Sequence, residues 1–376
     1  MNQFLSVPDS KYVSELFFEL VTIDSPSLGE KEMAARCARK LSALGFSVME
    51  DDAGERIGGN SGNLIATRRG HSSLTPILLT AHMDSVPPCH GIVPVLCDDG
   101  WVRSQGETVL GADDKAGITA IFAALHAMQS NPFLPTIQVV LTVAEELGLQ
   151  GSKNISKEYL VARHGLAIDS GGSPGTLVVG GPTLAKWKAS VTGRRAHAGV
   201  SPETGVSAIK VAAEAVAKMP HGRVDSKTTV NVGSFLGDGP TNVVADKAHL
   251  VGEARSHDDE RLTEVLHEIQ VAFEHAAAAR GATVQFESAV SYQGYSFEEQ
   301  HPIRQRVERA IRVARLEPRP VIRGGGSDAN IFTSIGIPTV NLGVGYEDIH
   351  SPSERVRMSD IAKTARIIAE FCQMNI

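Results

Sequence analysis

Histidines and acidic residues recur along the chain in short clusters, each following a run of apolar residues. The clusters are, in order, His82-Met83-Asp84, Asp113-Asp114, Glu145-Glu146, Asp169 and His350. Two divalent cations bound close together need one histidine and one carboxylate each, one shared carboxylate, and a further carboxylate as base. These residue types therefore predict a pair of metal ions and metal-assisted hydrolysis.

Each cluster alone also has an ordinary structural interpretation. The first could be a surface histidine, the second could cap a helix that begins near Lys115, and the third could be a solvated pair. Asp169 and His350 could be turn residues. We favour the metal interpretation because the clusters together complete two coordination spheres, and because the set lacks the thiolates of structural zinc sites. Such a set suits zinc, cobalt or manganese without selecting among them.

The spacing within the clusters predicts different tasks. His82 and Asp84 would share one face of an extended strand end, so that the carboxylate can fix the tautomer of the imidazole. Asp113 lies in a tight strand-to-helix turn, which favours a carboxylate shared between two ions. Neighbouring glutamates point in different directions, so one of Glu145 and Glu146 can bind metal while the other stays free as a general base.

The elements that must position these clusters alternate between strands and helices. Four apolar runs are typical of strands covered on both faces, and they span residues 64–67, 76–81, 136–143 and 166–168. Apolar residues at helical spacing predict helices over 29–44 and 118–128. The sequence therefore predicts an α/β fold with an open, mixed, doubly wound sheet, and it places the clusters at the carboxyl ends of the strands.

The order of the expected helices and strands changes in the middle of the chain. Between residues 181 and 292 the expected elements follow the order β-α-β-β-α-β, which is the ferredoxin-like pattern. We therefore predict an inserted α+β domain at 181–292 and a discontinuous catalytic domain formed by 1–180 and 293–376. After the insertion, the sequence predicts a Gly-rich turn at 324–326 and a last helix capped by Ser359.

The composition narrows the class of protein. Of 376 residues, 42% are hydrophobic, and the formal net charge of −7 comes with scattered basic residues, which argues against nucleic acid or an anionic membrane as partner. Residues 1–10 lack the pattern of a signal peptide, and no window offers the roughly 20 apolar residues of a membrane span. The four cysteines show no CxxC pairing. We expect a cytoplasmic protein with reduced thiols.

In this order, the motifs resemble those of the co-catalytic metallopeptidases that include peptidase T, glutamate carboxypeptidase and acetylornithine deacetylase. The likeness covers essentially the whole chain, and the Gly-Ala-Asp-Asp-Lys-Ala-Gly string at 111–117 is specific to that group. Peptidase T-like proteins are the most similar. The resemblance implies two divalent ions, with zinc expected, and a catalytic α/β domain with an inserted lid through which a homodimer can form.

The resemblance also assigns individual residues. It implies His82 and Asp169 on one metal, Glu146 and His350 on the other, Asp113 bridging, Glu145 as base, Asp84 orienting His82, and a cis peptide bond between Asp113 and Asp114.

Five further residues are expected to bind substrate. His197 resembles the lid histidine that stabilises the oxyanion, and Asn242 and Arg255 match lid positions that contact substrate, although both could be ordinary turn and strand residues. Arg323 resembles the arginine that grips the substrate carboxylate, but the string at 323–328 is one residue longer than the Arg-Gly-Gly-Thr-Asp of tripeptidases. Ser327 begins the next helix, whose backbone amides could bind an anion.

We predict an exopeptidase that acts on short peptides, most simply an aminopeptidase or tripeptidase. A deacylase or carboxypeptidase with the same dinuclear site is the first alternative. A non-catalytic binding protein that kept the fold is the second.

Overall fold

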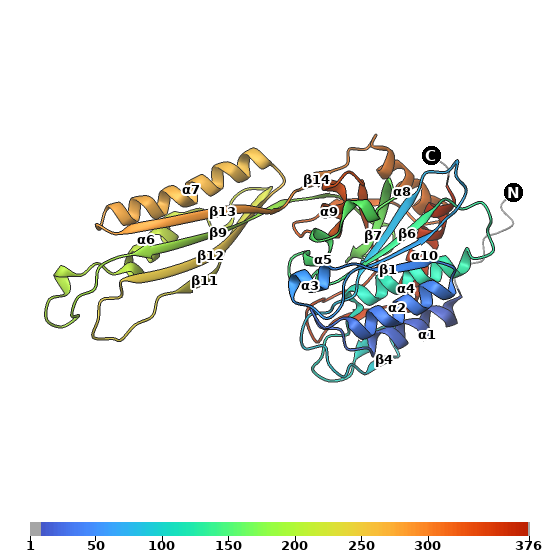
Figure 1. The fold of residues 1–376 in the computed structure, drawn as a ribbon, viewed down its shortest axis with the longest axis horizontal. Coiled ribbons are helices and arrows are strands. Elements are labelled where there is room, and N and C mark those ends of the chain that lie inside the picture. Colours follow the sequence, from blue (N-terminus) through green and yellow to red (C-terminus); the bar gives the residue numbers. More distant parts are fainter. Residues whose placement is uncertain (1–8, 375–376) are drawn as a thin grey trace. The chain divides into compact units, whose positions relative to one another are not determined.

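The structure of the protein is a computed structural model that describes residues 9–374. Most of the N-terminal segment for which no signal peptide is expected lies outside these residues. Packing divides the chain into two units, shown in Figure 1. The first comprises the residues up to Gly180, Ser296–Ile322 and those from Ser327 onward; the second comprises Gly181–Tyr295 and Arg323–Gly326.

Over residues 9–374, a mixed sheet of nine strands forms the frame of the first unit. Its strand order is β1-β2-β6-β3-β7-β16-β8-β14, with β15 paired to β8. Four central neighbours run parallel: β6 (Ile137–Thr142), β3 (Ile77–His82), β7 (His164–Ser170) and β16 (Thr339–Gly343). The flanking strands are β1 (Ser47–Glu50), β2 (Leu64–Arg68), β8 (Thr176–Gly181), β14 (Tyr295–Ser296) and β15 (Arg319–Ile322).

Helices cover this sheet on both faces. Every residue of β3 and β6 is buried, as expected for strands with apolar side chains on both sides. α4 (Ala112–Ala127) packs against β3 and β7 and is covered in turn by α1 (Ser10–Val21) and α10 (Met358–Gln373). Phe332 of α9 (Asp328–Ser334) packs against Ile65, Leu78 and Val140 of the sheet. The remaining α-helices are α2 (Lys31–Ala43), α3 (Ala53–Ile57), α5 (Gln150–Lys153) and α8 (Pro302–Val313). The predicted α/β fold with a mixed sheet is confirmed.

A small sheet of β17 (Arg355–Val356), β5 (Val102–Ser104) and β4 (Pro94–Leu96) adjoins α10. Because β17 pairs with β5, the chain is still extended at Arg357, and α10 begins directly after it. Arg357 is the N-cap residue, so the expectation that Ser359 caps this helix is wrong. Ser359 lies within the first turn.

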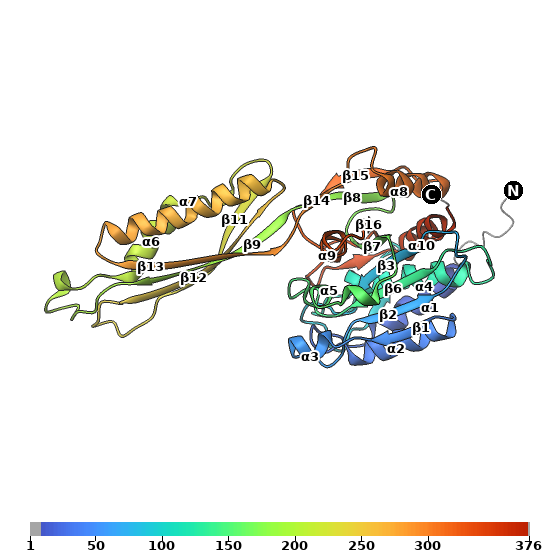
Figure 2. The same cartoon turned by 45° about the horizontal axis from the view of Figure 1, so that its top comes forward.

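The second unit is a five-stranded antiparallel sheet with two helices on one face (Figures 1 and 2). Its order is β10-β11-β12-β9-β13, which matches the ferredoxin-like pattern once the short β10 is set aside. Trp187 and Phe273 are at the centre of its core. The elements are β9 (Thr183–Thr192), α6 (Ala208–Lys218), β10 (Gly222–Arg223), β11 (Thr228–Leu236), β12 (Lys247–Ser256), α7 (Asp259–Ala278) and β13 (Thr283–Tyr292). Across residues 9–374 we find no helix with the length and apolar character needed to cross a membrane.

Candidate metal centre

The predicted clusters converge at one edge of the large sheet. His82 is the last residue of β3 and pairs with Thr142, the last residue of β6. Asp169 is the penultimate residue of β7, and His350 follows β16. Because these four strands are parallel neighbours, their carboxyl ends share one edge. Asp113 reaches the same edge from the start of α4.

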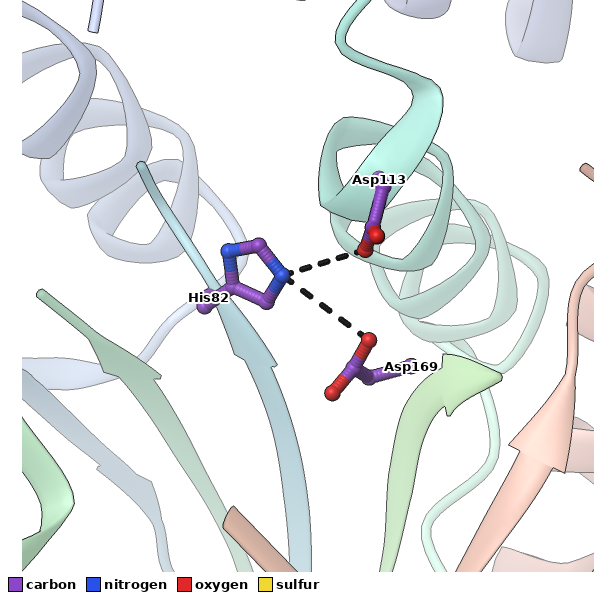
Figure 3. A group of neighbouring side chains, drawn as sticks. All are labelled: His82, Asp113 and Asp169. Carbon is purple, nitrogen blue, oxygen red and sulfur yellow. Dashed lines mark hydrogen bonds and ion pairs between the residues drawn. The ribbon is translucent and has the colours of Figure 1, made fainter. Parts of the chain in front are cut away.

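His82, Asp113 and Asp169 form one end of this cluster. The Nε2 atom of His82 lies 3.1 Å from Asp113 Oδ1 and 3.8 Å from Asp169 Oδ1, and both carboxylates point toward the imidazole (Figure 3). One ligand atom from each of the three lies within 4.8 Å of the other two. The three side chains can therefore hold a common cation.

His350 and Glu146 form the other end. His350 Nε2 lies 2.9 Å from Glu146 Oε1 and 3.4 Å from Asp113 Oδ2. Asp113 thus turns one carboxylate oxygen toward each histidine, which is the arrangement that a carboxylate shared by two cations requires. Its peptide bond to Asp114 is cis, as the resemblance implies.

Glu145 lies beside both ends. Its carboxylate belongs to a further group with His82 and Glu146, in which one ligand atom of each lies within 4.8 Å of the others. The backbone turn after β6 therefore presents both glutamates to the cluster, and both of them reach possible ligand positions.

The charges in the cluster are unbalanced. Burial raises the pKa of Asp169 and of Glu145, and the surrounding carboxylates raise it further. Hydrogen bonds to Asp113 and Glu146 raise the pKa of His350 to about 10. Although burial alone would lower the pKa of His82, hydrogen bonds to Asp113 and Asp84 hold it well above its ordinary value. Carboxylates crowded together out of water need protons or cations among them, which favours bound metal.

Asp84 has more partners than the sequence predicts. His82 Nδ1 lies 3.0 Å from the carbonyl oxygen of Asp84 and 3.3 Å from its carboxylate. The carboxylate also accepts hydrogen bonds from the Ser27 hydroxyl at 2.7 Å and from the backbone N–H groups of Glu145 at 3.0 Å and Glu146 at 3.2 Å. Asp84 therefore contacts the first histidine and also fixes the turn that carries the glutamate pair.

Two residues outside the predicted set hold Asp169. The buried Tyr346 hydroxyl donates to Asp169 Oδ1 at 3.1 Å. The Asn341 side chain accepts from the Asp169 N–H at 2.9 Å and donates to the Asp169 carbonyl at 2.6 Å. No periodicity or motif identifies Tyr346. Asn341 could have been suspected, because it is an amide side chain between the apolar Val340 and Leu342 in β16.

Glu354 holds the turn that presents Asp113. It is 1% exposed, and its carboxylate accepts hydrogen bonds from the N–H groups of Gly111 at 2.7 Å and Asp113 at 2.9 Å. Burial raises the pKa of Glu354 to about 7 against the opposing effect of these bonds. Its place four residues after His350, in Ser351-Pro352-Ser353-Glu354, is the only sequence signal that points to it.

The five predicted substrate-binding residues lie in three places. His197 forms an isolated bridge with Val243, and Ala198 next to it donates to the Asn242 carbonyl, so His197 and Asn242 are neighbours in the second unit. Arg255 on β12 donates hydrogen bonds to the Glu253 carboxylate and to the Gly324 carbonyl. The second bond places Arg255 near Arg323, the residue before Gly324.

Ser327 lies in the first unit. It is the N-cap residue of α9, and its N–H donates to Asn330 Oδ1 at 3.1 Å.

Comparison with known proteins identifies the group to which this chain belongs. The model of peptidase family M20/M25/M40 matches residues 78–374, the span that contains all five clusters. The chain belongs to peptidase family M20/M25/M40. This M20 peptidase is therefore a metal-dependent enzyme that hydrolyses peptide bonds, and the predicted resemblance and enzyme class are confirmed.

Three relatives resemble this M20 peptidase over nearly its whole length. The Bacillus subtilis protein YqjE, itself uncharacterised, is 42% identical over 97% of this chain and 98% of its own. The crystal structure of the aminopeptidase PepT from Bacillus cereus is 40% identical, with a TM-score of 0.91 over 98% of this chain and 99% of that one. A tripeptidase structure from Staphylococcus aureus is 37% identical, with a TM-score of 0.93 and the same coverage.

Proposed function

We propose that this M20 peptidase is an aminopeptidase that releases residues from the amino end of short peptides. The observation that carries the hydrolytic part of the proposal is the pair of contacts from Asp113, one oxygen toward His82 and the other toward His350. The likeness to a structure named as an aminopeptidase and to one named as a tripeptidase supports the choice of substrate.

The donor set fits two divalent ions. Imidazole nitrogens and carboxylate oxygens without thiolates suit zinc, cobalt or manganese, and we propose zinc. One ion would be held by His82 and Asp169, the other by Glu146 and His350, with Asp113 shared. When bound, the ions supply a Lewis acid for the scissile carbonyl and lower the pKa of an attacking water.

Glu145 is the proposed general base. Its N–H is fixed by Asp84, and its carboxylate lies beside His82 and Glu146, so it faces the place where the reacting water would be. In the proposed reaction the Glu145 carboxylate takes a proton from water as the carbonyl is attacked. It then delivers that proton to the leaving amine.

The substrate contacts remain proposals that rest on motif resemblance. We propose that His197, Asn242, Arg255, Arg323 and Ser327 contact the peptide, and alanine at each position is expected to raise KM. A homodimer through the second unit is also proposed, and sedimentation at micromolar concentration tests it. A cytoplasmic location is supported by the four cysteines, all of which are free thiols.

The choice of scissile end is tested with blocked substrates. A tripeptide free at both ends is offered beside versions acetylated at the amino end or amidated at the carboxyl end and beside N-acetyl amino acids, and released amino acid is measured. We expect acetylation to abolish release and amidation to leave it. Cleavage of N-acyl amino acids alone would instead identify a deacylase, and loss on amidation alone a carboxypeptidase.

Replacement of the proposed base tests the reaction itself. Glu145→Ala should retain its metal but lower kcat about 100-fold or more, because the proton transfer then has no positioned acceptor. Metal content and turnover of the purified variant are measured together. The exposed Glu158→Ala is the control and should behave as wild type. Near-normal turnover of Glu145→Ala would exclude Glu145 as the base.

A further inference from the structure

Asp328 is a buried acid that the proposed reaction does not use. It is the first residue of α9, directly after the Gly-rich turn, and it is 3% exposed. Its Oδ2 atom accepts a hydrogen bond from the Thr142 hydroxyl at 2.5 Å, and its Oδ1 atom accepts one from the Ser152 hydroxyl at 2.5 Å. Both carboxylate oxygens are therefore engaged by neutral donors on other elements.

The two donors bracket the segment that carries the glutamate pair. Thr142 is the last residue of β6, and Ser152 lies in α5. The residues between them, 143–151, include Glu145 and Glu146. One carboxylate thus ties together both ends of the segment that presents the proposed base.

The segment needs such a restraint. Ala144, next to Glu145, has φ of +48°, and Leu149 has φ of +64°. Residues other than glycine seldom adopt this left-handed backbone conformation, and it persists where the surroundings hold it. Inside the segment, the N–H of Ala144 donates to Glu30, and those of Glu145 and Glu146 donate to Asp84. The ends themselves are joined by the Gly151 N–H to the Val143 carbonyl and by the Asn63 side chain, which accepts from the Val143 N–H and donates to the Gly151 carbonyl. Asp328 adds a further link between the two residues that flank the segment.

An ordinary helix-terminal role explains Asp328 less well. An acid in the first turn is favourable beside the helix dipole. However, the N-cap position belongs to Ser327, whose N–H bonds Asn330, while the Asp328 carboxylate turns to β6 and α5. Thr142, which donates to Asp328, pairs with His82 across β6 and β3, so Asp328 lies close to the cluster.

We propose that Asp328 is a positioning residue for the proposed general base, holding the ends of segment 143–151 so that Glu145 keeps its direction. This inference rests on the proposed function of Glu145. It predicts that loss of the restraint lowers kcat while KM and metal binding change little, since neither the ligands nor the substrate contacts are removed.

The test compares Asp328→Ala with Asp328→Asn. Asparagine keeps the shape, and its amide can accept from one hydroxyl and donate to the other, so both links can survive. We expect Asp328→Ala to lower kcat about 10- to 100-fold, with KM within about twofold. With both proteins free of metal, hydrogen exchange of the amides in 143–151 should be faster in Asp328→Ala than in wild type. Titration of the variant with ZnCl2 should still give two equivalents. In Asp328→Asn, both kcat and the exchange rate should return most of the way to their wild-type values.

Two further variants guard against misfolding and general damage. The double variant Thr142→Val/Ser152→Ala removes the same hydrogen bonds without touching the acid, and it should reproduce the loss of kcat and the faster exchange. Asp360→Ala removes a first-turn acid of α10 that accepts a hydrogen bond from Lys363. It should change neither kcat nor the exchange of segment 143–151.

The outcomes separate this inference from the proposed function. Unchanged exchange and kcat in the folded double variant would overturn the positioning role of Asp328. The same conclusion would follow if Asp328→Asn lost as much kcat as Asp328→Ala. If Glu145→Ala kept its turnover, the base assignment would fail, whereas faster exchange in Asp328→Ala would still show the restraint.

Discussion

The two ends of the candidate metal centre are held in different ways. At one end the His82 side chain is 1% exposed and Asp169 is 12% exposed, and both lie on strands of the parallel core. At the other end His350 is 47% exposed and lies in a loop, opposite Glu146. The candidate ligands are therefore buried on strands at one end, whereas at the other end the histidine depends on an exposed loop.

The loop of His350 is closed at its base by two paired residues. Backbone hydrogen bonds join Glu347 and Arg355 in both directions, and their side chains form an ion pair. His350 itself has φ of +60°. Within this loop, Glu354 reaches inward to the N–H groups of the Asp113 turn. We infer that the His82 end binds its cation tightly, and that the His350 end binds a cation that exchanges more readily.

The largest effect is expected where the two ends meet. Asp113→Ala removes the carboxylate that faces both histidines, so both ions should bind at least about 100-fold more weakly and activity should be lost. Titration of metal-free protein with ZnCl2 and an assay on the same samples measure this. The exposed Asp98→Ala should leave both unchanged. Retention of one ion at wild-type affinity would show that Asp113 is not shared.

A selective effect is expected from Glu354→Gln. The glutamine oxygen can accept from one backbone N–H, but its NH2 group then faces the other, so the link between the loop and the Asp113 turn is broken. The more weakly bound ion should lose about 10- to 100-fold in affinity. The tighter ion shares Asp113 but keeps His82 and Asp169 on buried strands, so it should lose less. Zinc titration resolves the two events.

Glu347→Gln is the control for this variant, because it changes an exposed carboxylate at the base of the same loop. It should shift the weaker ion much less. Equal weakening of both ions by Glu354→Gln would mean that the two ends do not differ as we infer.

That the candidate ligands meet at one edge of the sheet could be predicted from the sequence, because the strands position them. His82 and Asp169 end apolar runs, and parallel neighbouring strands must bring their carboxyl ends to one edge. The same reasoning gave the α/β class and the ferredoxin-like order of the second unit. Both follow from periodicity, which local sequence carries directly.

The supporting residues could not be found in this way. Tyr346, Glu354 and Asp328 act through contacts with residues far away in sequence, at separations of 177, 241 and 186 residues for one contact of each. No local pattern encodes such pairs. Ser359 is a local pattern that misled the prediction. It is a good capping residue, but the pairing of β17 with β5 fixes the start of the helix two residues earlier.

The smallest effect is expected from Tyr346→Phe, which tests the buried end. The ring is 2% exposed and would remain packed, so the change removes only the hydroxyl that donates to Asp169 Oδ1. That oxygen is the one that faces His82 Nε2 at 3.8 Å. The tighter ion should therefore bind about tenfold more weakly, at the low end for an outer hydrogen bond to a ligand.

The same zinc titration checks this expectation, with Tyr159→Phe in the 3-10 turn Lys157–Tyr159 as a control that should change neither ion. Tyr346→Phe and Glu354→Gln act mainly on opposite ends, so their largest effects should fall on different ions and should add in the double variant. If both substitutions instead weaken the same ion most, the two ends behave as one unit, and the distinction between a buried and a loop-dependent end is wrong.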